Sequence, residues 1–136
     1  IFFEDVFVVV LPESHPLSAD SYKDFSVFAA ESFILPHEIE GSGYNHTVES
    51  ICLDAGFLPN VVHHTSSVSS ALRLVEAGLG ITIEPKGSLL GQNLAIKFIE
   101  LNNIPQKAQS VILWNDNTET EHQSILELVK KVINLT

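Results

Sequence analysis

Two short polar segments combine residue types that could hold a small anionic ligand. Ser42-Gly43 and Thr65-Ser66-Ser67 each stand immediately before a stretch in which apolar residues have helical spacing. The free N–H groups and the positive dipole end of a helix N-terminus attract a carboxylate or phosphate, and hydroxyls add hydrogen bonds. Hydroxyls at such places also cap helices. Both segments should lie at the carboxyl edge of the strands, where ligands bind in open α/β sheets, so a ligand site and simple capping remain the two alternatives.

Other residues with catalytic or metal-binding chemistry lack a partner at a suitable spacing. His63-His64 are adjacent on a predicted strand, so their side chains point to opposite faces and cannot chelate one ion together. Gly41-Ser42-Gly43 lacks the G-x-S-x-G spacing of a hydrolase nucleophile. Glu84 could serve as a general acid or base, but a solvated carboxylate at a strand end is the more common situation. We therefore predict no enzyme activity, no metal and no cofactor.

The pattern of apolar residues predicts strands that alternate with helices. The expected strands are 6–11, 33–35, 61–65, 79–83, 94–101 and 111–114. The expected helices are 44–55 with Gly56 as its stop, 68–77 with Gly78 as its stop, and a last helix that begins near Thr118 or Thr120 and runs through Val132. This order is typical of an α/β fold with a largely parallel sheet and helices on its faces.

Composition excludes several classes of protein. The 136 residues, 45% of them apolar, suit one packed domain. Seven Lys and Arg against 17 Asp and Glu give a net charge of −10, which disfavours direct contact with nucleic acid or an anionic membrane. The longest apolar run, residues 6–11, is too short to span a bilayer. The single Cys52 fits a reducing, cytoplasmic location, and the absence of Met with Ile1 at the start predicts a piece of a longer protein.

Several strings stand in consistent order over about residues 4 to 101: Val8–Pro12 followed by His15-Pro16-Leu17, then Phe33-Ile34, Cys52–Pro59 and Leu74–Ile81 with Pro85 beyond. Together they resemble the effector-binding domain of LysR-type transcriptional regulators. Cys52–Pro59 is similar to the family's C-x-x-A-G-F-x-P helix end. Leu74–Ile81 is similar to its L-V-x-A-G-L-G-I motif, the most specific of these strings. Glu84 departs from the family, which usually has an apolar residue before that proline.

The resemblance implies a type 2 periplasmic-binding-protein-like α/β fold with two lobes and a ligand cleft between them. Residues 4–107 would form lobe II, nearly complete. Residues 108–136 would supply the C-terminal strand and helix of lobe I. The rest of lobe I and the helix-turn-helix domain are expected to be missing from this sequence.

The implied function is to sense a small anionic metabolite and so control DNA binding by the missing helix-turn-helix domain. Ser42, Gly43, Thr65, Ser66 and Ser67 are the expected effector-binding residues. The expected partners are this effector, DNA only through the missing N-terminal domain, and further copies of the full-length protein in a homodimer or homotetramer, with no membrane partner. The alternative is a lobe of a solute-binding protein that serves a transporter, because the two classes share a fold.

Overall fold

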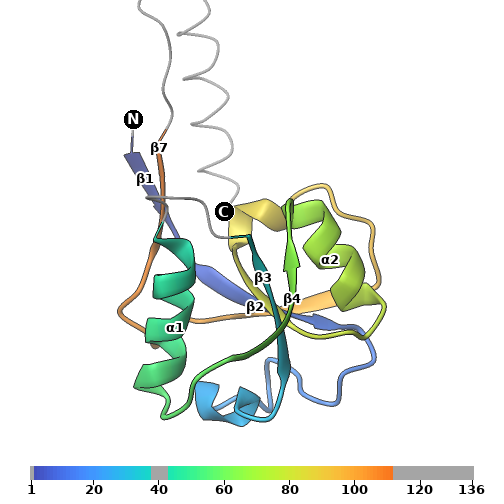
Figure 1. Cartoon of the computed structure of the whole chain (residues 1–136), viewed down its shortest axis with the longest axis horizontal. Helices are drawn as coiled ribbons and strands as arrows, with labels where there is room; N and C mark the ends of the chain where they lie inside the picture. Colours follow the sequence, from blue (N-terminus) through green and yellow to red (C-terminus); the bar gives the residue numbers. More distant parts are fainter. Residues whose placement is uncertain (1, 38–42, 112–136) are drawn as a thin grey trace, which may run out of the picture.

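The computed structural model describes residues 2–37 and 43–111 (Figure 1). In chain order the elements are β1 (Phe2–Asp5), β2 (Phe7–Pro12), the 3-10 helix η1 (Phe25–Phe28), β3 (Ser32–Pro36), α1 (Tyr44–Asp54), β4 (Asn60–Thr65), α2 (Val68–Glu76), β5 (Thr82–Pro85), the 3-10 helix η2 (Lys86–Leu89), β6 (Ile96–Glu100) and β7 (Ala108–Val111). The predicted final helix and residues 112–114 of the last predicted strand lie outside the described residues.

The main sheet is mixed, with β2 inside it. β2 pairs antiparallel with both β5 and β6, and β3 pairs parallel with β4. Backbone hydrogen bonds of 2.8 Å from Ile34 N to Ile81 O and from Ile81 N to Ser32 O join β3 to the start of β5. The prediction of a largely parallel sheet is therefore wrong for β2. A run of apolar residues shows that a strand is buried but not its direction, and β2 inserts between two strands that come much later in the chain.

The core has two parts, one on each face of the sheet. Alternate residues of β2 enter different parts: Val9 packs in the cluster that contains Ile51 of α1, and Val8 in the cluster that contains Leu72 of α2. Because a helix covers each face, both sets of β2 side chains are buried. This explains the unbroken apolar run, which is typical of a strand with no solvent-facing side.

The two helices end where the sequence predicts. Gly56 and Gly78 follow them with φ of 92° and 81°, a left-handed conformation that a side chain disfavours. Gly80 has a different role, because a Cβ there would lie 2.8 Å from the carbonyl oxygen of Ser32. This glycine therefore permits the close approach of the α2–β5 connection to β3.

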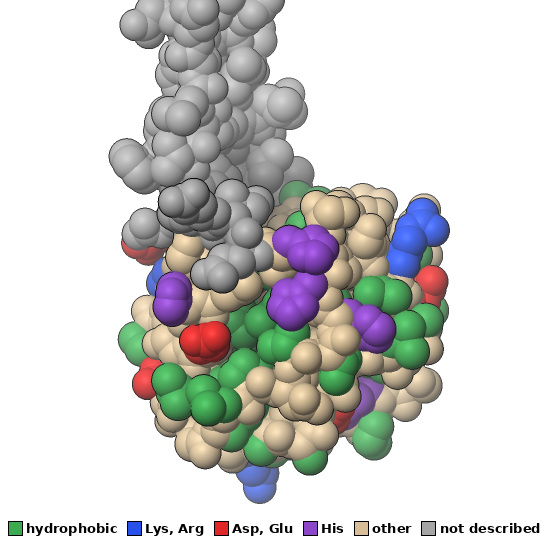
Figure 2. Space-filling model, viewed as in Figure 1, with side chains coloured by type: hydrophobic (Ala, Val, Ile, Leu, Met, Phe, Trp, Pro, Cys, Tyr) green, Lys and Arg blue, Asp and Glu red, His purple; other side chains and the backbone are tan. Residues whose placement is uncertain are grey.

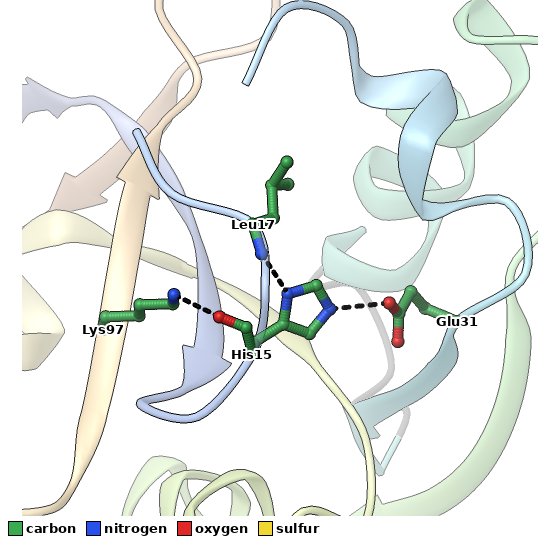
Figure 3. A network of polar contacts seen from close by, with 4 residues as sticks. All are labelled: His15, Leu17, Glu31 and Lys97. Carbon is green, nitrogen blue, oxygen red and sulfur yellow. Dashed lines mark hydrogen bonds and ion pairs between the residues drawn. The ribbon is translucent and has the colours of Figure 1, made fainter. Parts of the chain in front are cut away.

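His15 fixes the loop after β2 (Figure 3). Its Nδ1 accepts a hydrogen bond of 3.1 Å from the backbone N–H of Leu17, and its Nε2 lies 2.7 Å from Oε1 of Glu31. Nδ1 is thus an acceptor, so the ring proton sits on Nε2 and is donated to Glu31. Lys97 of β6 donates to the carbonyl oxygen of His15. These contacts account for His15 as a structural residue.

β1 and β7 form a separate antiparallel pair, with Asp5 opposite Ala108. The carboxylate of Asp5 accepts hydrogen bonds from the backbone N–H of Val6 at 2.8 Å and of Gly87, in η2, at 2.7 Å. The domain boundary expected between residues 107 and 108 coincides with the start of β7, and it stays a prediction. Over the described ranges, no helix has the length and apolar character needed to cross a membrane.

Candidate ligand-binding pocket

A pocket of about 340 Å³ lies where β3, β4 and β5 end and where α1 and α2 begin. Four segments contribute its walls: Pro36 and His37 at the end of β3, Tyr44 and Asn45 in the first turn of α1, Thr65–Val68 from the end of β4 to the start of α2, and Glu84, Pro85 and Ser88 at the end of β5 and in η2. This volume suits a small organic molecule.

The β4–α2 segment brings three of the predicted site residues, Thr65, Ser66 and Ser67, into the pocket wall. Thr65 is 7% exposed and its hydroxyl donates to the carbonyl oxygen of Ser67 at 3.2 Å. Ser67 Oγ accepts from the backbone N–H of Ser70 at 3.1 Å, so Ser67 caps α2. Capping and a place in the pocket are therefore compatible, because the first N–H groups of α2 have no partner within the helix and lie at the same wall.

Of the other predicted segment, Ser42-Gly43, only Gly43 lies among the residues that the structure describes. Gly43 is the N-cap of α1 with φ of 65° and no side-chain cap, and Ser42 lies outside the described residues. The pocket wall is made by the next two residues, Tyr44 and Asn45, which the sequence did not single out as site residues. Nδ2 of Asn45 donates to the carbonyl oxygen of Pro36 at 3.4 Å, whereas its Oδ1 is buried and accepts no hydrogen bond from any residue that the structure describes.

Glu84 is a buried acid, and the expectation of a solvated carboxylate is wrong. Its side chain lines the pocket and is only 5% exposed. Burial disfavours the charged form and raises the pKa of this carboxyl to about 7. The neighbouring Tyr44 is partly buried, and its hydroxyl donates to the carbonyl oxygen of Ile83. Burial raises the pKa of this phenol well above its usual value, and the charge of Glu84 adds to the effect.

One signal in the sequence could have located Glu84. It interrupts the apolar stretch that begins at Ile81 and stands before Pro85, in a strand that must reach the core. A charged residue inside such a strand is either at its exposed end or in a pocket. The sequence pattern could not distinguish these two cases, because the residue that packs over Glu84, Tyr44 of α1, comes forty residues earlier in the chain.

The pocket combines two kinds of polar surface on an apolar frame. The N-termini of α1 and α2 carry partial positive charge, which suits a carboxylate, whereas Glu84 and Asn45 Oδ1 are acceptors. No Lys or Arg among the described residues lines it, and on the face shown in Figure 2 these side chains lie only at the margins. Within residues 2–37 and 43–111, no three His, Cys, Asp or Glu side chains are placed to hold a metal ion. The arrangement is suited to binding.

Comparison with known protein families identifies the chain's relatives. Residues 1–130 match the family model of the LysR substrate binding domain. The chain belongs to this family. The LysR resemblance in the sequence is thereby confirmed, and the family is one of transcriptional regulators.

One curated relative illustrates the relationship. The HTH-type transcriptional regulator ShiR of Corynebacterium glutamicum (strain R) is 33% identical over 82 residues, which are 60% of this chain and 28% of ShiR. The chain thus spans less than a third of that relative.

The solved structures confirm the expected type 2 periplasmic-binding-protein-like fold. The effector-binding domain of BenM, with its effector benzoate, aligns with a TM-score of 0.67 and 24% identity, over 79% of this chain and 49% of that one. The effector-binding domain of QuiR in complex with shikimate aligns with a TM-score of 0.67 and 23% identity, over 94% of this chain and 63% of that one.

Proposed function

We propose that this chain is the effector-binding part of a LysR-type transcription regulator and that its effector is a small carboxylate held in the pocket described above. The observation that carries the proposal is the convergence of two helix N-termini on one pocket of about 340 Å³. Such N-termini bind anions through free N–H groups and the helix dipole without needing an ion pair. The relative named above is a transcriptional regulator, which favours this function over a transporter's solute-binding protein.

The proposed roles follow from the contacts. Backbone N–H groups in the first turn of α2 and the hydroxyl of Ser66 donate to the carboxylate. The hydroxyl of Thr65 turns to the carboxylate from the carbonyl oxygen of Ser67, while Ser67 keeps the helix start in place. The first turn of α1, which begins after Gly43, faces the same carboxylate from the other side of the pocket. Ser42 stays a candidate of the same kind. The apolar body of the effector packs on Pro36, Val68 and Pro85.

The rest of the proposal concerns the longer protein. Residues 4–107 serve as lobe II and residues 108–136 as part of lobe I, and the effector shifts how the lobes and the subunits of a homodimer or homotetramer are arranged. DNA is bound through a helix-turn-helix domain outside this sequence, because a chain with a net charge of −10 lacks the basic surface that phosphates require. The regulator acts in the cytoplasm and without catalysis.

The test is a calorimetric titration of the chain with benzoate and with shikimate. Replacing Thr65→Ala together with Ser66→Ala removes two donors to a charged ligand. Each lost bond costs about 1.5–3 kcal/mol, so the affinity for at least one of the two acids should fall about tenfold to a hundredfold. The matched control is Ser69→Ala, which removes an exposed hydroxyl of α2 that does not line the pocket. Unchanged affinity in the double variant, or no binding of either acid at millimolar concentration, would contradict the proposal.

A further inference from the structure

Glu84 is out of place in a pocket built only for an anion. Its carboxyl is 5% exposed and faces the same cavity as the starts of α1 and α2. The other titratable side chains that line this cavity are His37 and Tyr44. The nearest lysine in sequence, Lys86, is engaged elsewhere, with its Nζ 2.5 Å from Oε1 of Glu100. Among the described residues, no Lys or Arg lines the pocket with Glu84, and Glu84 takes part in no ion pair.

A second acceptor lies in the same wall. Asn45 Oδ1 is buried and accepts no hydrogen bond from the residues that the structure describes. A buried acceptor without a donor costs free energy, and native pockets carry such atoms where a ligand or water completes the bond. The pocket is thus divided: the start of α2 offers donors, whereas Glu84 and Asn45 offer acceptors that need donors from the ligand.

We propose that Glu84 is a specificity-determining residue, which selects effectors that carry a hydroxyl or ammonium donor in addition to their carboxylate. The effector class is then a hydroxylated or amino-substituted carboxylic acid. This inference rests on the proposed function, because it assumes that the carboxylate of the effector lies at the helix N-termini.

The selection works mainly against simple carboxylates. A plain acid that fills the cavity excludes water from Glu84 and Asn45 and leaves their oxygens without a donor. A site built to bond a donor group rejects an analogue that lacks it more strongly than an apolar site rejects an added group. A hydroxyl or ammonium group restores the missing bond, and an ammonium group also compensates the charge of an ionised Glu84.

The experiment compares two probes that differ only in donors: shikimate and cyclohex-1-ene-1-carboxylate, which is the same ring acid without the three hydroxyls. Calorimetric titration of the parent chain should show at least a tenfold preference for shikimate. In Glu84→Leu the preference should fall to about twofold or less, while Glu84→Gln, which keeps an acceptor, should retain most of it. Glu49→Leu removes an exposed carboxylate of α1 outside the pocket and should leave the preference unchanged. Melting curves verify that each variant is folded.

The outcomes separate this inference from the proposed function. If the parent chain binds both probes equally, or if the preference survives in Glu84→Leu, Glu84 does not set specificity, although the pocket still binds carboxylates. If Thr65→Ala with Ser66→Ala leaves the affinity for both probes unchanged, or if neither probe binds at millimolar concentration, the proposed function fails and the inference fails with it.

Discussion

Replacing Glu84→Gln should make the stability of the folded chain less dependent on pH. Burial raises the pKa of this carboxyl from 4.5 to about 7 in the folded state, whereas in the unfolded chain it returns to the ordinary value. Between these values the folded state binds the proton more tightly, so the contribution of Glu84 to stability is fully present below about pH 4.5. That contribution decreases as the pH rises and is lost above about pH 7.

The size of the effect follows from the shift. A difference of about 2.5 pKa units at about 1.4 kcal/mol each amounts to about 3–4 kcal/mol in full, of which about 3 kcal/mol of destabilisation develops between pH 4.5 and pH 8. Glutamine has the shape and hydrogen-bonding capacity of the neutral acid but does not ionise. The variant should therefore be about as stable as the parent near pH 4.5 and about 3 kcal/mol more stable at pH 8.

Urea unfolding of both proteins at pH 4.5 and pH 8 measures this difference. The other titrating groups are present in both proteins and cancel in the comparison. Glu49→Gln, at an exposed position on α1, is the matched control and should follow the parent at both pH values. If the gap between Glu84→Gln and the parent is the same at the two pH values, Glu84 does not titrate differently in the folded state, and the argument from its burial is refuted.

Three further substitutions or reagents test the packing around the site. Gly80→Ala should cost about 1–3 kcal/mol in urea unfolding, because its Cβ would lie 2.8 Å from the carbonyl oxygen of Ser32. Ser67→Ala should lower stability by about 1 kcal/mol through loss of the α2 cap on Ser70 N–H, as thermal melting would show; an unchanged melting temperature argues against the cap. Cys52 is fully buried and burial raises its pKa to about 12, so a thiol reagent should label it only as fast as the chain opens, and rapid labelling of folded protein would contradict its place in the core.

The helices could be predicted closely because local signals define their ends. The apolar spacing from Tyr44 and the stop at Gly56 gave α1 to within a residue, and the segment Thr65-Ser66-Ser67 and Gly78 bracketed α2. The short strand β1, Phe2–Asp5, could not be predicted, since its partner β7 lies a hundred residues away. The direction of β2 also depends on such distant pairing.

Part of the site could be predicted because, like the helix ends, it is marked by local sequence signals. Thr65, Ser66 and Ser67 stand at a helix start that the sequence reveals, and the structure places all of them in the pocket wall. Tyr44 and Glu84 could not be recognised as their neighbours, because that contact depends on how α1 packs over the end of β5. Whether these residues bind an effector is a question for the titrations above.

The hydrogen bond from Gly87 to Asp5 has a mechanical consequence. Gly87 lies between Pro85 and Ser88, two residues of the pocket wall, and Asp5 is the last residue of β1. The fit is close, since a Cβ at Gly87 would lie 3.1 Å from Oδ2 of Asp5. A displacement of the pocket rim must therefore either break this 2.7 Å bond or pull on β1 and, through its ladder, on β7. Because the Asp5 carboxylate links the pocket rim at Gly87 to the β1–β7 pair, a movement of either part is transmitted to the other.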